Sequence, residues 1–122
     1  MGSHPLNLAL RFLLEMAALV AMGYWGWTQA DGVGRFIAAL GIPLLSAIVW
    51  GTFAVPADPS RSGNAPIPIP GVVRLLIEVL VFAGACWALY ATGKKLASAA
   101  FGMFVLTHYL LSYDRVRWLL TQ

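Results

Sequence analysis

Two long apolar runs in this chain each carry an arginine followed, one helical turn later, by a glutamate. The first pair is Arg11 and Glu15, and the second pair, 63 positions further along, is Arg74 and Glu78. An ionised side chain at the centre of a bilayer helix costs about 2.5–3.5 kcal/mol on insertion scales, so four unpaired charges facing lipid would cost roughly 10 kcal/mol. These charges must therefore be paired, turned into the protein interior, or both.

Composition places the chain among integral membrane proteins. Of its 122 residues, 60% are hydrophobic and 11% are charged, whereas soluble domains are usually about 45–50% apolar and about 25% charged. The mean hydropathy is +0.77. The net charge of +3 comes from basic residues that lie mostly at the ends of apolar runs. That placement is typical of membrane anchoring, so membrane lipid is an expected partner and nucleic acid is not.

Four segments are long enough to cross a bilayer, which takes about 20 helical residues. We expect helices over residues 5–28, 34–54, 70–92 and 95–113, followed by an amphipathic tail over residues 114–122. The connections are short enough to make consecutive helices antiparallel neighbours. The predicted fold class is therefore all-α integral membrane, with four transmembrane helices in a single domain.

The spacing of the two Arg/Glu pairs further predicts an internal repeat. The domain divides into two tandem hairpins, residues 5–54 and 70–113. Each hairpin returns the chain to its starting side, so the halves should be related by a pseudo-two-fold axis along the membrane normal.

A proline-rich strap, residues 56–69, joins the two hairpins. Its prolines are Pro56, Pro59, Pro66 and Pro68. Alternating prolines favour an extended polyproline-type segment without internal hydrogen bonds. We therefore expect a solvent-exposed strap with Asp58 exposed in it.

The orientation follows from the basic residues near the two ends of the helices. One side carries Arg35, Lys94 and Lys95, and the other carries Arg61, Arg115 and Arg117, together with Arg11 and Arg74 if these reach the interface. Counting the last two favours both termini in the cytoplasm by five to three, and without them the count is tied.

Four runs of the sequence resemble a known family. They are residues 6–15 (LNLALRFLLE), 24–27 (YWGW), 49–56 (VWGTFAVP) and 74–78 (RLLIE). In this order they resemble the YrdB-like family of small four-span bacterial membrane proteins, a domain of unknown function. The resemblance covers nearly the whole chain and implies a fold and a location in the bacterial inner membrane. It implies no activity, so the function has to be inferred from the residues.

Polar groups gather in the half of the membrane nearest the N-terminus. With a rise of about 1.5 Å per residue, the first Arg/Glu pair lies about 9 and 15 Å from the start of its helix, and the second lies about 6 and 12 Å from the start of its own. The last helix descends to the same side and brings in a histidine at a similar depth. The predicted ligand-binding site consists of Arg11, Glu15, Arg74, Glu78 and His108, with Trp50 and Tyr109 at its mouth.

The Arg/Glu pairs have two interpretations. In the structural one, each pair closes within its helix, or Arg11 bonds Glu78 while Arg74 bonds Glu15 and so locks the hairpins together. In the functional one, the pairs bind an ion, an anionic solute or a lipid head group, because a guanidinium holds a protein carboxylate and an anionic ligand equally well. His108 is likewise either a core histidine bonded to a neighbouring carboxylate or carbonyl, or a proton relay.

Three function classes follow from this polar cluster. The first is transport or permeation of a small or anionic solute, with the protein acting as a homodimer because four spans enclose little volume. The second is a non-catalytic accessory or scaffold protein whose buried pairs fix the register of the helices. The third is a lipid- or quinone-interacting redox accessory. No Gly-rich phosphate loop, nucleophile elbow or zinc signature occurs in the sequence, which disfavours an enzyme, and we expect no cofactor or metal.

Solvent access separates the first two classes. A transport site needs a water-filled cavity that touches the Arg/Glu pairs, whereas a structural network is dry and closed.

Overall fold

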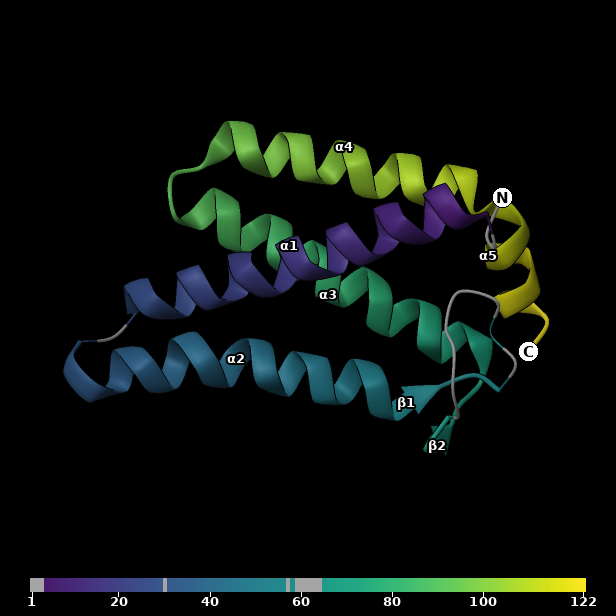
Figure 1. The fold of residues 1–122 in the computed structure, drawn as a ribbon, viewed down its shortest axis with the longest axis horizontal. Coiled ribbons are helices and arrows are strands. Elements are labelled where there is room, and N and C mark those ends of the chain that lie inside the picture. Colours follow the sequence, from purple (N-terminus) through teal and green to yellow (C-terminus); the bar gives the residue numbers. More distant parts are fainter. Residues whose placement is uncertain (1–3, 30, 57, 59–64) are drawn as a thin grey trace.

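The computed structural model describes residues 4–29, 31–56, 58 and 65–122. Helices dominate this part of the chain: α1 Pro5–Gln29, α2 Gly32–Thr52, α3 Gly71–Ala91, α4 Lys95–Leu111 and α5 Tyr113–Leu120, with two short strands, β1 Phe53–Ala54 and β2 Ile67–Pro68. The first four helices lie side by side, and α1 begins at the same end of the bundle at which α5 ends (Figure 1). The prediction of an all-helical chain is confirmed.

Three of these helices are long and apolar enough to cross a membrane. They are α1, α2 and α3, with mean hydropathies of 1.6, 1.9 and 2.1 over their most apolar windows. Helix α4 has 17 residues, and a bend of 71° separates it from α5, so the two make a fourth candidate span only when taken together. The chain is therefore a helical protein with three or four candidate membrane spans in its described part. The fourth span and the tandem repeat of hairpins stay predictions.

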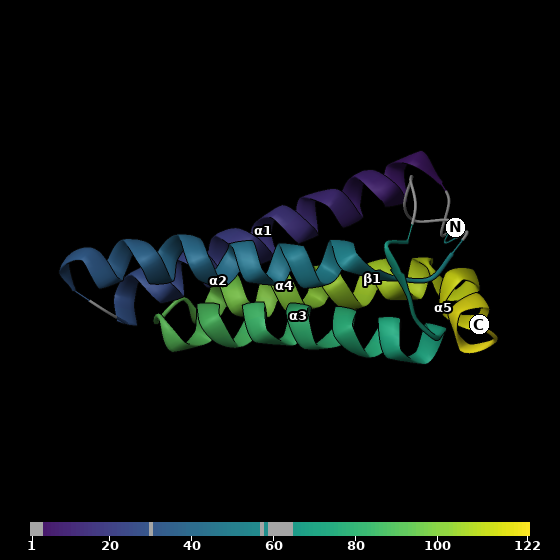
Figure 2. The ribbon, with the colours of Figure 1, turned by 90° about the horizontal axis from the view of Figure 1, so that it is seen from below.

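Helices α1 and α3 pack against each other in the middle of the bundle, while α2 packs on α1 and α4 packs on α3 (Figures 1 and 2). The core between them is made mostly of small and aromatic side chains, among them Ala18, Ala21, Phe82, Ala85 and Phe101, together with Leu14 and Met22. None of the residues of α2 is buried. Many of its apolar side chains, among them Leu40, Leu44 and Leu45, are exposed, as a bilayer allows and water does not.

Glycines bring α1 and α2 together near the turn that joins them. A Cβ atom on Gly26 would lie 2.6 Å from the carbonyl oxygen of Ala38, and one on Gly23 would lie 3.0 Å from the oxygen of Ala39. Away from this contact the two helices diverge toward the start of α1, as both ribbon views show (Figures 1 and 2). Helices α1 and α2 therefore form a V whose open side lies at the end where α1 begins.

The segment after α2 differs from the predicted exposed strap. Strand β1 pairs in parallel with β2, and the amide of Ile69 donates to the carbonyl oxygen of Ala54 at 2.9 Å. Ala54, Val55 and Asp58 are all buried. Because non-proline residues between the prolines keep their amide donors, the segment can still pair. Among the described strap residues, Pro56, Pro66, Ile67 and Pro68 are exposed as predicted, whereas the prediction of exposure is wrong for Asp58. Pro59 and Arg61 lie outside the described residues.

Helix α5 occupies most of the tail predicted over residues 114–122 and has a buried and an exposed face. It turns by 71° from α4 and packs on the start of α3, where a Cβ on Gly71 would lie only 1.7 Å from the carbonyl oxygen of Leu119. Leu119 and Arg115 are buried. The prediction that Arg115 lies at the membrane interface is therefore wrong, since the bend turns its side chain into the bundle. With Arg11 and Arg74 buried as well, the orientation of the chain stays a prediction.

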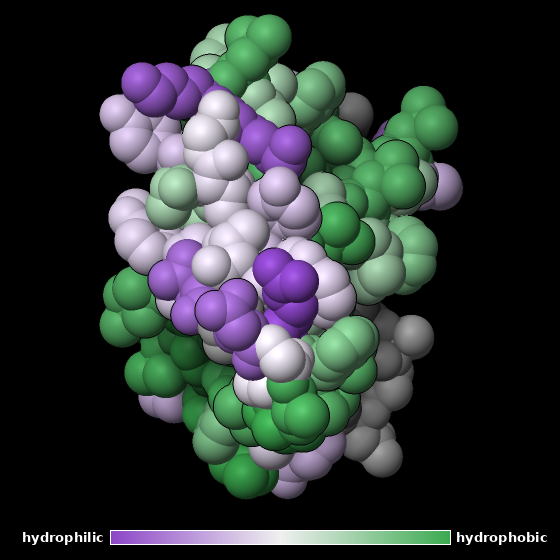
Figure 3. Space-filling view, turned by 90° about the vertical axis from the view of Figure 1, so that its left-hand side faces the viewer, coloured by the Kyte–Doolittle hydropathy of each residue, from purple (hydrophilic) through white to green (hydrophobic). Residues whose placement is uncertain are grey.

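The opposite end of the bundle carries the two hairpin turns and is hydrophilic. Figure 3 shows a band of hydrophilic surface across this end, bordered by hydrophobic surface. Asp31, Lys94 and Lys95 are exposed at the turns, and Gly93, two residues after the end of α3, adopts a φ of 81°, which is typical of a glycine that ends a helix. A hydrophilic end on an otherwise apolar bundle is what a membrane–water boundary requires.

Candidate functional site: a buried network of arginines and carboxylates

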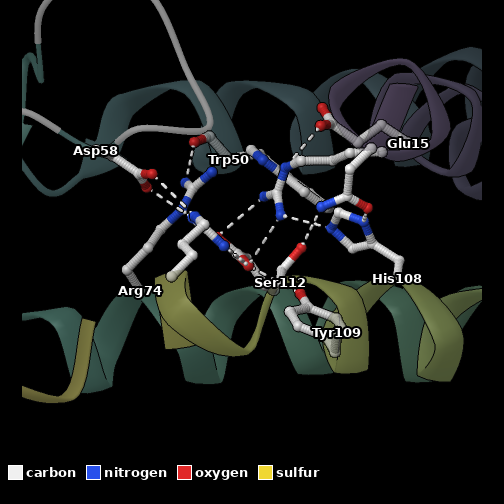
Figure 4. A network of polar contacts seen from close by, with 11 residues as sticks. Glu15, Trp50, Asp58, Arg74, His108, Tyr109 and Ser112 are labelled. Carbon is white, nitrogen blue, oxygen red and sulfur yellow. Dashed lines mark hydrogen bonds and ion pairs between the residues drawn. The ribbon is translucent and has the colours of Figure 1, made fainter. Parts of the chain in front are cut away.

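Glu78 of α3 is the centre of a buried polar network. Figure 4 shows the side chains of this network close together, among them those of Asp58, Arg74 and Tyr109. The Glu78 side chain is 0% exposed and accepts from three guanidinium groups. Arg11 Nη2 lies 3.0 Å from Oε2, Arg74 Nε donates to Oε2 at 2.9 Å, and Arg115 donates to both oxygens at 3.0 and 2.7 Å. The Tyr109 hydroxyl donates to Oε1 at 2.8 Å. One carboxylate thus joins α1, α3, α4 and α5.

A second carboxylate, Asp58, completes the network from the segment after α2. Arg115 donates from Nε and Nη2 to the two oxygens of Asp58 at 2.9 and 2.6 Å, the bidentate geometry that suits a guanidinium and a carboxylate. Asp58 is 4% exposed and Arg115 is 1% exposed. The prediction that Asp58 is exposed is therefore wrong. Its carboxylate is buried because it pairs with Arg115, which was predicted to lie at the membrane interface.

Arg74 ties the end of α2 to α3. Its Nη1 atom donates to the backbone carbonyl of Trp50 and, at 2.8 Å, to that of Phe53. The last carbonyls of a helix lack intrahelical partners and carry partial negative charge, so a cation is well placed there. The arginine therefore stabilises two negative groups, this helix end and Glu78.

Arg11 joins α1 to the network and also reaches along its own helix. In addition to Glu78, its Nε lies 3.1 Å from Glu15 Oε1. The predicted pair between Arg11 and Glu78 is confirmed. The predicted crossing pair of Arg74 with Glu15 is wrong, because Arg74 pairs with Glu78 one turn along α3.

His108 is a hydrogen-bonded core histidine. A guanidinium has only donors, so at the contact of 3.5 Å between Arg11 Nη1 and His108 Nε2 the ring nitrogen accepts. The ring proton is then on Nδ1, which lies 3.0 Å from the amide oxygen of Asn7. Asn7 in turn donates to the Ser112 hydroxyl at 2.7 Å. Both ring nitrogens are engaged, as the core interpretation of His108 expects.

The structure brings together all seven residues of the predicted site. The two aromatic residues also contact the charged groups of the network. The Trp50 ring lies under two guanidinium groups, with Arg11 Cζ at 5.6 Å and Arg74 Cζ at 5.5 Å from its centroid. The predicted site did not include four further members of the network, namely Asn7, Asp58, Ser112 and Arg115.

The charges of the network balance. Three arginines, Arg11, Arg74 and Arg115, face three carboxylates, Glu15, Asp58 and Glu78. Five of these six charged side chains are at most 4% exposed, whereas the side chain of Glu15 is 28% exposed. Most of the network is therefore closed, and its charged part opens at one residue in the part of the chain that the structure describes.

Glu15 borders a pocket of about 200 Å³ in the open part of the V between α1 and α2. The α1 wall is formed by Glu15, Met16 and Leu19, and the α2 wall by Ala47, Trp50 and Gly51. The pocket thus combines one carboxylate with an aromatic ring and aliphatic surface.

Comparison with known proteins assigns the family but no activity. Residues 9–106 match the family described as "Protein of unknown function (DUF2568)". The chain is also similar to the "Uncharacterized protein YrdB" of Bacillus subtilis (strain 168), with 46% identity over 116 residues, which cover 95% of this chain and 94% of that protein. No solved structure matches the chain. The resemblance to the YrdB-like family is confirmed, and the chain belongs to the DUF2568 family of proteins of unknown function.

Proposed function

We propose that this protein binds a small organic cation at Glu15 and lets it pass through the membrane, with the arginine–carboxylate network behind Glu15 acting as a structural lock. The observation that carries the proposal is the contrast in access within the network. Glu15 is 28% exposed and borders a pocket, while its ion-pair partner Arg11 is 3% exposed. A polar group that is partly open inside an apolar bundle is a functional-site candidate in membrane proteins.

The state of the arginines disfavours an anionic solute. Each of the three buried guanidinium groups already holds a carboxylate of the protein. An anion would have to displace one of these carboxylates and leave it buried without its partner, which typically costs 3–5 kcal/mol. The closed side of the network therefore suits helix packing better than anion binding.

The composition of the pocket favours a cation. A carboxylate attracts positive charge, and the face of a tryptophan attracts an organic cation within about 6 Å of the ring. Glu15 Oε1 faces Arg11, and Glu15 Oε2 has no polar partner among the described residues. The aliphatic walls from Met16, Leu19 and Ala47 suit the apolar part of an alkylammonium ion.

The position of Glu15 supports passage across the membrane. It lies about 15 Å along α1 from Pro5, close to the middle of a bilayer. Transport proteins commonly place their substrate site at this depth. Because four helices enclose little volume, the proposal includes a homodimer, placed in the bacterial cytoplasmic membrane.

Equilibrium binding of radiolabelled tetraethylammonium to the protein in lipid nanodiscs tests the binding step. We expect saturable binding by the parent, a loss of at least about tenfold in affinity for Glu15→Gln, and no change for Asp31→Asn, which removes an exposed carboxylate in the α1–α2 turn. Absence of saturable binding by the parent, or full binding by Glu15→Gln, would refute the proposal.

Uptake of the same cation into proteoliposomes tests the passage step. We expect uptake by the parent above that of protein-free liposomes, and uptake at the protein-free level for Glu15→Gln. Binding without uptake would refute the passage step and leave only the binding step of the proposal.

A second candidate function, an accessory or scaffold protein without a ligand at Glu15, has an observation in its favour. The six charges of the network balance, and five of them are buried. In this alternative the network has no role other than to fix the register of the helices. In that case Glu15→Gln would change neither binding nor uptake.

A further inference from the structure

A groove on another side of the bundle has a composition unlike that of the Glu15 pocket. It lies between α1 and α4 toward the hydrophilic end, has a volume of about 390 Å³, and has Lys94 among its lining residues. We infer that this groove binds the acyl chain of an anionic phospholipid, with the phosphate of the head group at Lys94.

The groove has the direction that an acyl chain needs and the length to hold part of one. On α1 its wall follows Ala17, Val20, Ala21 and Tyr24, positions i, i+3, i+4 and i+7 on one face of the helix. These residues extend about 10 Å along the helix axis. The groove therefore runs into the membrane from the end that carries the lysine.

The groove is open because several of the side chains that line it are small. On the α4 side the groove is lined by Lys94, Ala97 and Phe101, again spaced along one helix face. Alanines at positions 17, 21 and 97 leave room that larger side chains would fill. A lipid chain is the apolar group available to fill such a groove from the bilayer.

Charge selects the kind of lipid. Lys94 Nζ lies 5.1 Å from the centroid of the Tyr24 ring, at the outer end of the groove, and Lys95 follows it. The sequence from residue 79 to residue 113 contains no acidic residue, and neither lysine forms an ion pair with a residue that the structure describes. A phosphate without a balancing choline is the complementary head group.

A second groove of similar size provides an internal comparison. It has a volume of about 320 Å³ and lies among α1, α2 and α3, with Trp25, Ser46, Gly84 and Trp87 among its lining residues. No lysine or arginine lines it. It should therefore accept lipid chains without preference for the head group.

Native mass spectrometry with phosphatidylglycerol and phosphatidylcholine of identical acyl chains tests the inference. We expect the parent to bind phosphatidylglycerol about fivefold more tightly than phosphatidylcholine, since a lysine near an anionic head group contributes about 1 kcal/mol. Lys94→Gln should remove this preference, while Lys95→Gln, whose lysine does not line the groove, should keep most of it.

Substitutions that fill each groove in turn show which groove holds the acyl chain. Ala97→Leu should weaken the binding of phosphatidylglycerol, whereas Gly84→Leu, which fills the second groove, should leave its preference over phosphatidylcholine unchanged. Equal losses for Lys94→Gln and Lys95→Gln would reduce the effect to surface charge and overturn the inference. Equal binding of the two lipids by the parent would also overturn it, and so would competition by free glycerol 3-phosphate at the same concentration as the lipid. A change in oligomeric state on Ala97→Leu would overturn it as well, because it would assign the groove to a second copy of the chain.

Discussion

The two ends of the bundle hold their helices together by different means. At the end where α1 begins, Glu78 and Asp58 join α1, α3, α5 and the segment after α2 through three arginines. At the hydrophilic end, Gly23 and Gly26 let the backbones of α1 and α2 touch. Close backbone contact needs no charge, but it holds only the two helices that touch. One carboxylate with three guanidinium groups can join several elements at once, at the cost of burying the charges.

This difference suggests what each end contributes. Small-residue contacts stabilise helix pairs in a bilayer through van der Waals packing, whereas buried ion pairs contribute little net stability but strongly disfavour arrangements that leave a charge alone. We therefore expect substitutions at the charged end to have larger effects, and substitutions at the glycine end to be local. The following changes test this comparison, from the largest expected effect to the smallest.

Replacing Glu78 by alanine should have the largest effect. The change leaves Arg11, Arg74 and Arg115 without their shared carboxylate, and breaking a buried pair typically costs 3–5 kcal/mol of unfolding free energy. Thermal unfolding in mild detergent, followed by circular dichroism, measures it. Asp31→Ala removes an exposed carboxylate and serves as the control. A Glu78→Ala protein as stable as this control would show that the network does not hold the bundle.

Removing Asp58 should be the next most severe change. Arg115 keeps its two hydrogen bonds to Glu78 in this variant, so the loss is that of charge-assisted hydrogen bonds, about 1.5–3 kcal/mol. The same unfolding assay on Asp58→Ala measures it. An exposed Asp58 would give a shift no larger than that of Asp31→Ala, which would contradict its burial against Arg115.

A methyl group at the glycine end should have a smaller, local effect. In Gly26→Ala the new Cβ would lie 2.6 Å from the carbonyl oxygen of Ala38, so α1 and α2 must move apart, at a typical cost of about 1–3 kcal/mol. Gly41→Ala on α2 is the matched control, because nothing lies within 4 Å of its added Cβ. That change should be neutral or stabilising, since alanine is the better helix former by about 1 kcal/mol. Equal shifts for the two variants would show that the helices do not pack through Gly26.

Neutralising Glu15 should have the smallest effect on stability. Its ion pair with Arg11 is partly exposed, and such pairs are usually worth about 0–1 kcal/mol. Glu15→Gln should therefore unfold close to the parent temperature while losing tetraethylammonium binding. If it destabilises the protein as much as Glu78→Ala does, Glu15 belongs to the lock and is not a ligand-facing group.

Local sequence patterns predicted most of the fold. The apolar runs placed the helices within a few residues of α1 to α4, because hydrophobicity and length decide which segments enter a bilayer. The cost of burying charge also identified Arg11, Glu15, Arg74 and Glu78 as one group. Both inferences need only the local sequence and the position of each residue along its helix.

Arg115 and Asp58 could not be found in the same way. They are 57 positions apart, and they meet because α5 turns back at Ser112 while the segment after α2 folds inward. Periodicity within one helix says nothing about either bend. Charge balance was the available signal: three buried arginines need a third carboxylate beside the two glutamates, and Asp58 is the acidic residue between α2 and α3.

Mapping the reactive carboxylates tests most directly whether the network is closed except at Glu15. Dicyclohexylcarbodiimide is apolar and forms a stable adduct with carboxyl groups that it can reach from the membrane, and peptide mass spectrometry locates the adduct. In the folded protein in lipid we expect labelling of Glu15, slowed by tetraethylammonium, and no labelling of Glu78 or Asp58 until the protein is unfolded. Labelling of Glu78 or Asp58 as fast as Glu15, or no labelling of Glu15 at all, would contradict a closed lock with one open carboxylate.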